Sequence, residues 1–234
     1  DTVRNEAGAS IDARASAQAN AVADPDENGY MNGPGVHTAS AAHGIQLGDG
    51  TKSVFNAGPI RATAQSTTVA GASAESDLWD TSTRVVVSAT ASAQGIGTGE
   101  GDISIWNSGD IEARATATSS AYSNSDSVDD AYARLDTVLM AEAQGIVAAG
   151  GGTVTVENAG SIAVEAEASG YATGRGDSGG DGYGEVYMTM DPTVRASGIA
   201  VGDAVSASIR NQAGATIAVG ATLSADLDLN GDEY

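Results

Sequence analysis

A repeat of about 51 residues constrains this chain more than any other feature of its sequence. An Asn followed by Gly two or three residues later recurs with spacings of 51, 51, 51 and 53 residues, at Asn5, Asn56, Asn107, Asn158 and Asn211. A Gly-Ile pair recurs with spacings of 51, 50 and 53 residues, beginning at Gly44, Gly95, Gly145 and Gly198. Two independent markers that keep one period indicate stacked copies of a single structural unit.

The segments after the Asn-containing turns alternate apolar and polar residues with a period of two. In the third unit the apolar positions are Ile111, Ala113, Ala115 and Ala117, and polar residues lie between them. This period is typical of a β-strand with one buried face, and it excludes a helix although Ala favours helices. The segments before each Gly-Ile pair alternate in the same way. We therefore expect each unit to contain an outbound strand and a returning strand.

These features predict an all-β fold: a parallel β-helix, or β-solenoid, of about five stacked coils that forms a single domain over residues 1–234. Large inward residues lie near the Asn-Gly turns and Ala follows them, so we expect a flat, Ala-lined blade attached to a wider end. An aromatic content of 4% agrees with a thin core. Coils stacked about 4.8 Å apart would align the repeated Asn side chains, whose amides could hydrogen-bond from coil to coil. Asn and Gly also tolerate the positive φ that a tight corner can need.

Both ends of the chain are expected to present open strand edges. The chain opens at Thr2–Asn5, midway through a unit, and closes just past an outbound strand. Open edges invite pairing with another chain. Two explanations remain: the chain is a segment of a longer solenoid, or it associates with itself head to tail.

The charge balance limits the partners of the chain. Lys and Arg total 10 and Asp and Glu total 31, which gives a net charge of −21. Such a chain repels nucleic acid and anionic membrane surfaces, so we expect neither as a partner and favour cations or basic surfaces. No apolar stretch approaches the roughly 18 residues of a membrane span, and we expect no membrane insertion. The absence of Cys excludes disulfides and fits a bacterial surface protein.

Two acidic segments at the far end of the expected blade have the pattern D-x-D-x-N-G, the first half of a calcium-binding loop. The candidate ligands are Asp24, Asp26, Asn28, Asp226, Asp228 and Asn230. Alternating side-chain oxygens can reach one hard cation, and the Gly permits a sharp bend. The Glu expected at loop position twelve is missing, because Gly35 stands there in the first segment. We predict Ca²⁺ binding at these tips, with solvated acidic turns as the alternative, and exclude a complete EF-hand.

A second candidate site is the tripeptide Arg175-Gly176-Asp177, which spells an integrin-recognition motif. It lies in a Gly-rich segment that we expect to be an exposed loop, and adhesion through it is a further hypothesis. The two histidines, His37 and His43, are expected on one strand face about 20 Å apart. That separation is too large for a shared metal ion.

The sequence also bears on two other classes of function. Asp49, Asp102 and Asp203 follow the Gly-Ile pairs and could align as the carboxylate column of a polysaccharide-active enzyme. Asp is common in turns, however, and no basic residue recurs beside these positions, so we expect no enzymatic activity. An ice-binding face would need a regular Thr array, whereas the outward positions of the strands are mixed.

The turn Asn-(Ala/Ser)-Gly-x-Ile, as in 107–111, and its flanking strands resemble the β-helical passenger regions of bacterial autotransporters and filamentous-haemagglutinin-like adhesins. The resemblance covers nearly the whole chain, although a coil of 51 residues is long for those families. It implies an extracellular or bacterial cell-surface location, a structural or adhesive role and a host or matrix surface as partner, and it carries over no catalytic residue.

We therefore predict an extracellular structural protein, a subunit of a filament, sheath or surface layer assembled by end-to-end stacking. One alternative is an adhesive stalk or passenger segment of a larger surface adhesin. A minor alternative is a polysaccharide-active β-helix enzyme.

Overall fold

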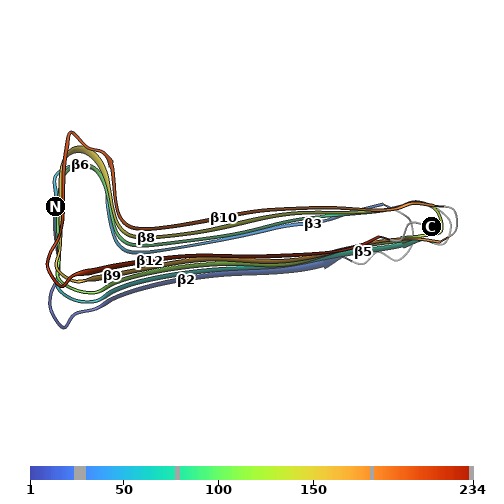
Figure 1. Cartoon of the computed structure of the whole chain (residues 1–234), viewed down its shortest axis with the longest axis horizontal. Helices are drawn as coiled ribbons and strands as arrows, with labels where there is room; N and C mark the ends of the chain where they lie inside the picture. The colour runs from blue at the N-terminus through green and yellow to red at the C-terminus, as the bar shows by residue number, and fades with distance from the viewer. Residues whose placement is uncertain (24–29, 77–79, 180–181, 232–234) are drawn as a thin grey trace.

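The computed structural model describes residues 1–23, 30–76, 80–179 and 182–231, which form β-strands and no helix. Long outbound strands form one layer of a flat blade, and return strands form the layer above it (Figure 1). The outbound strands are β2 (Ile11–Ala23), β5 (Ile60–Ser76), β7 (Ile111–Ser127), β9 (Ser161–Ser178) and β12 (Thr216–Gly231). The two layers converge toward the narrow end of the blade.

The return strands lead back to a short third side of each coil. They are β3 (Tyr30–Leu47), β6 (Thr81–Asn107), β8 (Ala131–Asn158) and β10 (Gly184–Asp203). β6 and β8 continue through a bend into this third side, which we call the wall. The wall consists of β1 (Thr2–Asn5), β4 (Lys52–Asn56), residues 103–107 of β6, residues 154–158 of β8, and β11 (Ser206–Asn211).

Every strand pair in the described chain is parallel, and the register repeats once per coil. The outbound sheet has the order β12-β9-β7-β5-β2, and the other sheet has the order β1-β4-β6-β8-β10, with β3 paired to β6 and β11 paired to β8. Ile11, Ile60, Ile111 and Ile162 are successive partners in the outbound sheet. This arrangement confirms the predicted parallel β-solenoid with a repeat of about 51 residues.

The interior of the blade is lined with alanine, as predicted. Inward alanines of the outbound and return sheets are fully buried, among them Ala62, Ala64, Ala113, Ala115, Ala166, Ala89, Ala91, Ala93, Ala141 and Ala143, each 0% exposed. Nearer the wall the interior is filled by larger residues, including Ile60, Ile96, Ile111 and Ile146. Small side chains therefore set a narrow spacing between the sheets, and the wider wall end holds most of the branched apolar volume.

Toward the narrow end the interior also contains buried hydroxyl groups, beside a second apolar cluster that includes Val85, Val87 and Leu135. These hydroxyls were not predicted from the sequence. Thr38 Oγ1 lies 2.6 Å from both Ser66 Oγ and Thr68 Oγ1, and Thr83 Oγ1 lies 2.7 Å from Ser123 Oγ. These hydroxyls join the two sheets across the blade. Because the partners are themselves buried hydroxyls, each group exchanges its lost hydration for a hydrogen bond.

Each Gly-Ile pair marks the bend at which the layer of return strands ends and the segment that leads to the wall begins. Gly95 and Ile96 are both buried, so the in-out alternation of the strand breaks at this point. A Cβ atom on Gly95 would overlap the Cγ2 atom of Ile111 and would lie 2.6 Å from the carbonyl oxygen of Gly145. The isoleucine after an Asn-Gly turn thus packs on the glycine of a Gly-Ile pair. This contact explains why the two markers recur together.

Candidate functional site

A column of asparagine side chains runs through the corner between the wall and the outbound sheet. Asn5 Nδ2 donates to Asn56 Oδ1 (2.7 Å), and the pattern continues from Asn56 to Asn107 (2.6 Å), to Asn158 (2.7 Å) and to Asn211 (2.7 Å). The three central side chains are 0% exposed. The predicted amide ladder is confirmed, and it links every coil of the described chain to the next.

The glycines beside this column have a packing role. A Cβ atom on Gly109 would lie 2.8 Å from the carbonyl carbon of Gly58 and would collide with the backbone of the coil below. The expectation that these turns need a positive φ is wrong for Gly58, Gly109 and Gly160, and holds for Gly8 (φ 87°) and Gly214 (φ 86°). Close stacking of successive corners, and not left-handed backbone, excludes a side chain from the central turns.

Both ends of the described solenoid present strand edges with a partner on one side only. These edges belong to β1, β2 and β3 at one end and to β10, β11 and β12 at the other. At the second end, Leu223, Leu227 and Leu229 of β12 project into the interior position of the blade and remain 52%, 44% and 57% exposed. The corresponding residues of β9 are Ala168, Ala172 and Gly174. An apolar row thus lies open along this edge.

The candidate calcium ligands have two different outcomes. Asp24, Asp26 and Asn28 lie outside the described residues. Asp226, Asp228 and Asn230 lie in β12, where they pair in register with β9, so the expected turn is a strand here. Within the described ranges, no group of three or more His, Cys, Asp or Glu side chains is placed to hold a metal ion. Calcium binding therefore stays a prediction.

The tripeptide Arg175-Gly176-Asp177 also lies in a strand and not in the expected exposed loop. It is part of β9 and pairs with Asn124–Asp126 of β7. Arg175 Nη2 contacts Asp177 Oδ2 at 2.6 Å, and Gly176 is buried. The parallel ladder holds this segment extended, and its two charged side chains bind each other.

Asp49 and Asp102, which follow Gly-Ile pairs, have structural partners. Asp49 Oδ1 accepts the N–H of Glu100 at 3.0 Å, and Asp102 Oδ1 accepts the N–H of Thr153 at 2.8 Å. Each carboxylate therefore caps the corner of the next coil. His37 and His43 are exposed on the outer face of β3, and His43 Nδ1 lies 3.1 Å from Gln94 Oε1.

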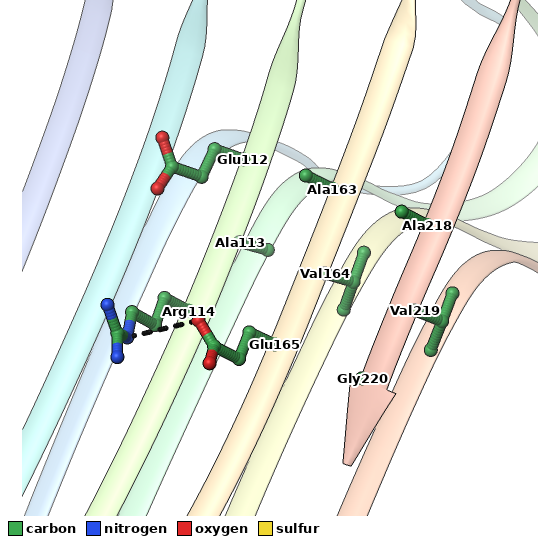
Figure 2. A pocket seen from close by; sticks show the side chains of 9 residues that line it. All are labelled: Glu112, Ala113, Arg114, Ala163, Val164, Glu165, Ala218, Val219 and Gly220. Atoms are coloured by element: carbon green, nitrogen blue, oxygen red, sulfur yellow. Dashed lines mark ion pairs between the residues drawn. The ribbon is translucent and has the colours of Figure 1, made fainter.

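A shallow hollow of about 370 Å³ lies at the start of the outbound sheet. Its small outward residues are Ala163, Ala218 and Gly220, and longer charged side chains rise beside them. Figure 2 shows Arg114 and Glu165 directed toward each other from neighbouring strands, with Arg114 Nε 3.4 Å from Glu165 Oε2. This ion pair joins two coils at the exposed surface, where such a pair contributes about 0–1 kcal/mol.

Acidic side chains gather around Tyr132 near the narrow end of the blade. The Tyr132 hydroxyl donates to Asp130 Oδ2 at 3.3 Å. The negative charge of Asp130 is the largest cause that raises the pKa of Tyr132, and desolvation, this hydrogen bond and the charges of Glu185 and Asp80 add to it. Negative potential therefore accumulates at this end of the molecule, which attracts cations.

Two functional features were missed by the sequence reasoning. The row of leucines in β12 stands where earlier coils have Ala, Ser or Gly, and the difference is visible once the repeats are aligned. The second feature is the residue directly before each Asn of the column, which lies on the outer face of the wall. These positions include Phe55 and Trp106, which are 40% and 38% exposed.

No protein-family model, no curated protein and no solved structure matches this chain. The fold alone defines the class of protein, a parallel β-solenoid. Across the described residues there is no helix with the length and apolar character that crossing a bilayer requires.

Proposed function

We propose that this chain is a structural β-solenoid of an extracellular or bacterial cell-surface assembly, such as a filament, sheath or surface layer, built by end-to-end stacking. The observation that carries the proposal is the pair of open ends joined by one continuous amide column. A neighbouring copy could place its β1 beside β11 and its β2 beside β12, and the ladder and the asparagine column would then continue across the junction.

The exposed leucines of β12 support this proposal. An apolar row on a chain of net charge −21 is a surface that a stacked neighbour would cover, since large exposed apolar patches mark interaction sites. The described outbound sheet has five strands, whereas the return positions hold four, namely β3, β6, β8 and β10. At such a junction the leucines would lie between β12 and the strands of the neighbouring copy.

A proline at the first edge tests the stacking. Ile11 N–H donates at 3.0 Å to the carbonyl oxygen of Pro59, the residue directly before β5. In a parallel ladder the N–H of even-numbered β2 residues therefore points to the open side. Ser16→Pro removes one such edge donor and leaves the internal ladder intact. We expect sedimentation and electron microscopy to show polymers for the native chain and for Ser16→Ala, and monomers for Ser16→Pro.

The opposite edge gives an independent variant. Leu227→Ser removes exposed apolar surface from β12 and should weaken assembly while the melting temperature of the monomer stays close to that of the native chain. Native protein that stays monomeric at all concentrations, or assembly that both variants leave unchanged, would contradict stacking.

Adhesion by a stalk or passenger segment is the second candidate function. The resemblance of the turns to surface adhesins supports it, and so do the exposed aromatic side chains on the wall. This candidate needs the long blade as a rigid support and does not need assembly.

A further inference from the structure

The outer face of the wall carries a row of one side chain per coil, directly before each asparagine of the column. In register across the wall these side chains are Arg4, Phe55, Trp106, Glu157 and Arg210. All point away from the interior, because their neighbours Val54, Ile105 and Val156 are buried. The row therefore crosses a flat surface of five adjacent strands.

The centre of this row is aromatic. Phe55 and Trp106 are partners on adjacent strands and lie about 4.8 Å apart along the stack. They remain 40% and 38% exposed, and the chain contains only one Phe and two Trp. The guanidinium of Arg4 lies over the Phe55 ring, 5.1 Å from its centre. Exposed aromatic side chains beside arginine are the composition of a binding surface.

The arginines of the row differ from the other cations of the molecule. Among the described residues, most Lys and Arg side chains lie within ion-pair distance of a carboxylate, and those that do not are Arg4, Arg195 and Arg210. Arg4 lies next to Phe55 in the row, and Arg210 lies beyond Glu157 at the other end. In a chain with 31 acidic residues, these cations keep donors available to a ligand.

A second row of the same face consists of hydroxyl side chains. Two residues before the aromatic row, the wall strands place in register Thr2, Ser53, Ser104, Thr155 and Ser208. The face thus has aromatic rings near its centre and hydroxyl groups along one side. The aromatic row also contains charged donors, Arg4 and Arg210, and one charged acceptor, Glu157. The ligand of this face should present an apolar face and many hydroxyl groups at its edges.

We propose that the outer face of the wall binds an extended polysaccharide chain across the stacked strands. A pyranose ring has a face of C–H groups that can cover Phe55 and Trp106, and its edge hydroxyls can bond Arg4, Glu157, Arg210 and the hydroxyl row. This inference does not depend on stacking of the solenoid.

Affinity electrophoresis in gels containing hydroxyethyl cellulose or polygalacturonate tests the proposal. We expect at least one polymer to retard the native chain, and Phe55→Ala and Trp106→Ala each to weaken the interaction about tenfold. Tyr171→Ala is the matched control, because Tyr171 is also exposed (45%) but lies on the outbound sheet. Greater sensitivity to Arg4→Ala and Arg210→Ala with polygalacturonate would show that the arginines bind sugar carboxylates.

Fluorescence gives a second readout. In a Trp79→Phe background Trp106 is the sole tryptophan, so a bound sugar should shift its emission in a saturable way that Phe55→Ala weakens. Absence of retardation in both gels would overturn the proposal. Equal losses in Tyr171→Ala and Phe55→Ala would also overturn it. If Phe55→Ala changes only the oligomeric state, the face contacts a second copy and the proposal is wrong.

Discussion

At the scale of single residues, the buried amide column carries the contact between coils. Asn107 accepts from Asn56, and it donates both to Asn158 and to the carbonyl oxygen of Gly109 at 3.0 Å. Asn5, at the end of the column, has one neighbour, Asn56. A central asparagine therefore makes more hydrogen bonds within the column than the terminal one.

Asn107→Ala should therefore destabilise the chain more than Asn5→Ala does. The central change leaves the buried Asn56 donor and Asn158 acceptor without partners, at about 1–3 kcal/mol for each group. The terminal change leaves one such group. Urea denaturation followed by circular dichroism gives the free energy of unfolding of each variant. Equal losses in the two variants would contradict a column stabilised by hydrogen bonds between neighbouring amides.

The spacing of the sheets depends on single alanines. Ala115 and Ala166 are 0% exposed between the two sheets, so Ala→Leu at either position should overpack the blade and cost about 1–3 kcal/mol or more. Thr116→Leu introduces the same side chain on the outer face of the same strand and should change the free energy of unfolding by about 0.5 kcal/mol or less. Similar losses at Ala115 and Thr116 in thermal denaturation would contradict the close spacing.

At the scale of elements, the ladder overrides local turn patterns. The pattern D-x-D-x-N-G at 226–231 is a loop signal when read alone, yet this segment pairs residue by residue with β9. Its carboxylates lie on alternate positions of an extended strand, about 7 Å apart. A cation bound there needs further ligands from outside β12.

Calcium should nevertheless stabilise the chain if either acidic segment binds it. A ligand that binds only the folded state raises the melting temperature. Asp24→Ala or Asp228→Ala should reduce this gain, whereas Glu6→Gln, an exposed change beside the asparagine column, should not. The measurement is differential scanning calorimetry of chelator-treated protein with millimolar Ca²⁺. An unchanged melting temperature would contradict calcium binding at either segment.

At the scale of the whole molecule, stability is a sum of coils and of the contacts between neighbours. Asn56 and Asn107 occupy equivalent positions one coil apart, so removing residues 57–107 joins Asn56 to Ser108 in register. We expect this shortened chain to fold as a thinner solenoid with a lower melting temperature. Far-ultraviolet circular dichroism and thermal denaturation provide the measurement.

The control for this experiment is the removal of residues 57–82, which joins the corner of one coil to a return strand. That junction removes β5, the outbound strand that lies between β2 and β7, and the chain should not fold cooperatively. Failure of the full-coil deletion to fold, or success of the half-coil deletion, would contradict the independence of the coils.

The solenoid follows from the sequence alone, because its period, its alternation and its small residues are local properties that every coil repeats. The repeat alone places Asn107 in a column and Ala115 in a thin interior. The tertiary structure decided the rest. It showed that Gly95 packs on Ile111, that Thr83 meets Ser123 across the blade, and that Arg175–Asp177 is extended. These outcomes depend on contacts between residues 16 to 40 positions apart or on neighbouring coils, and no local pattern encodes such contacts.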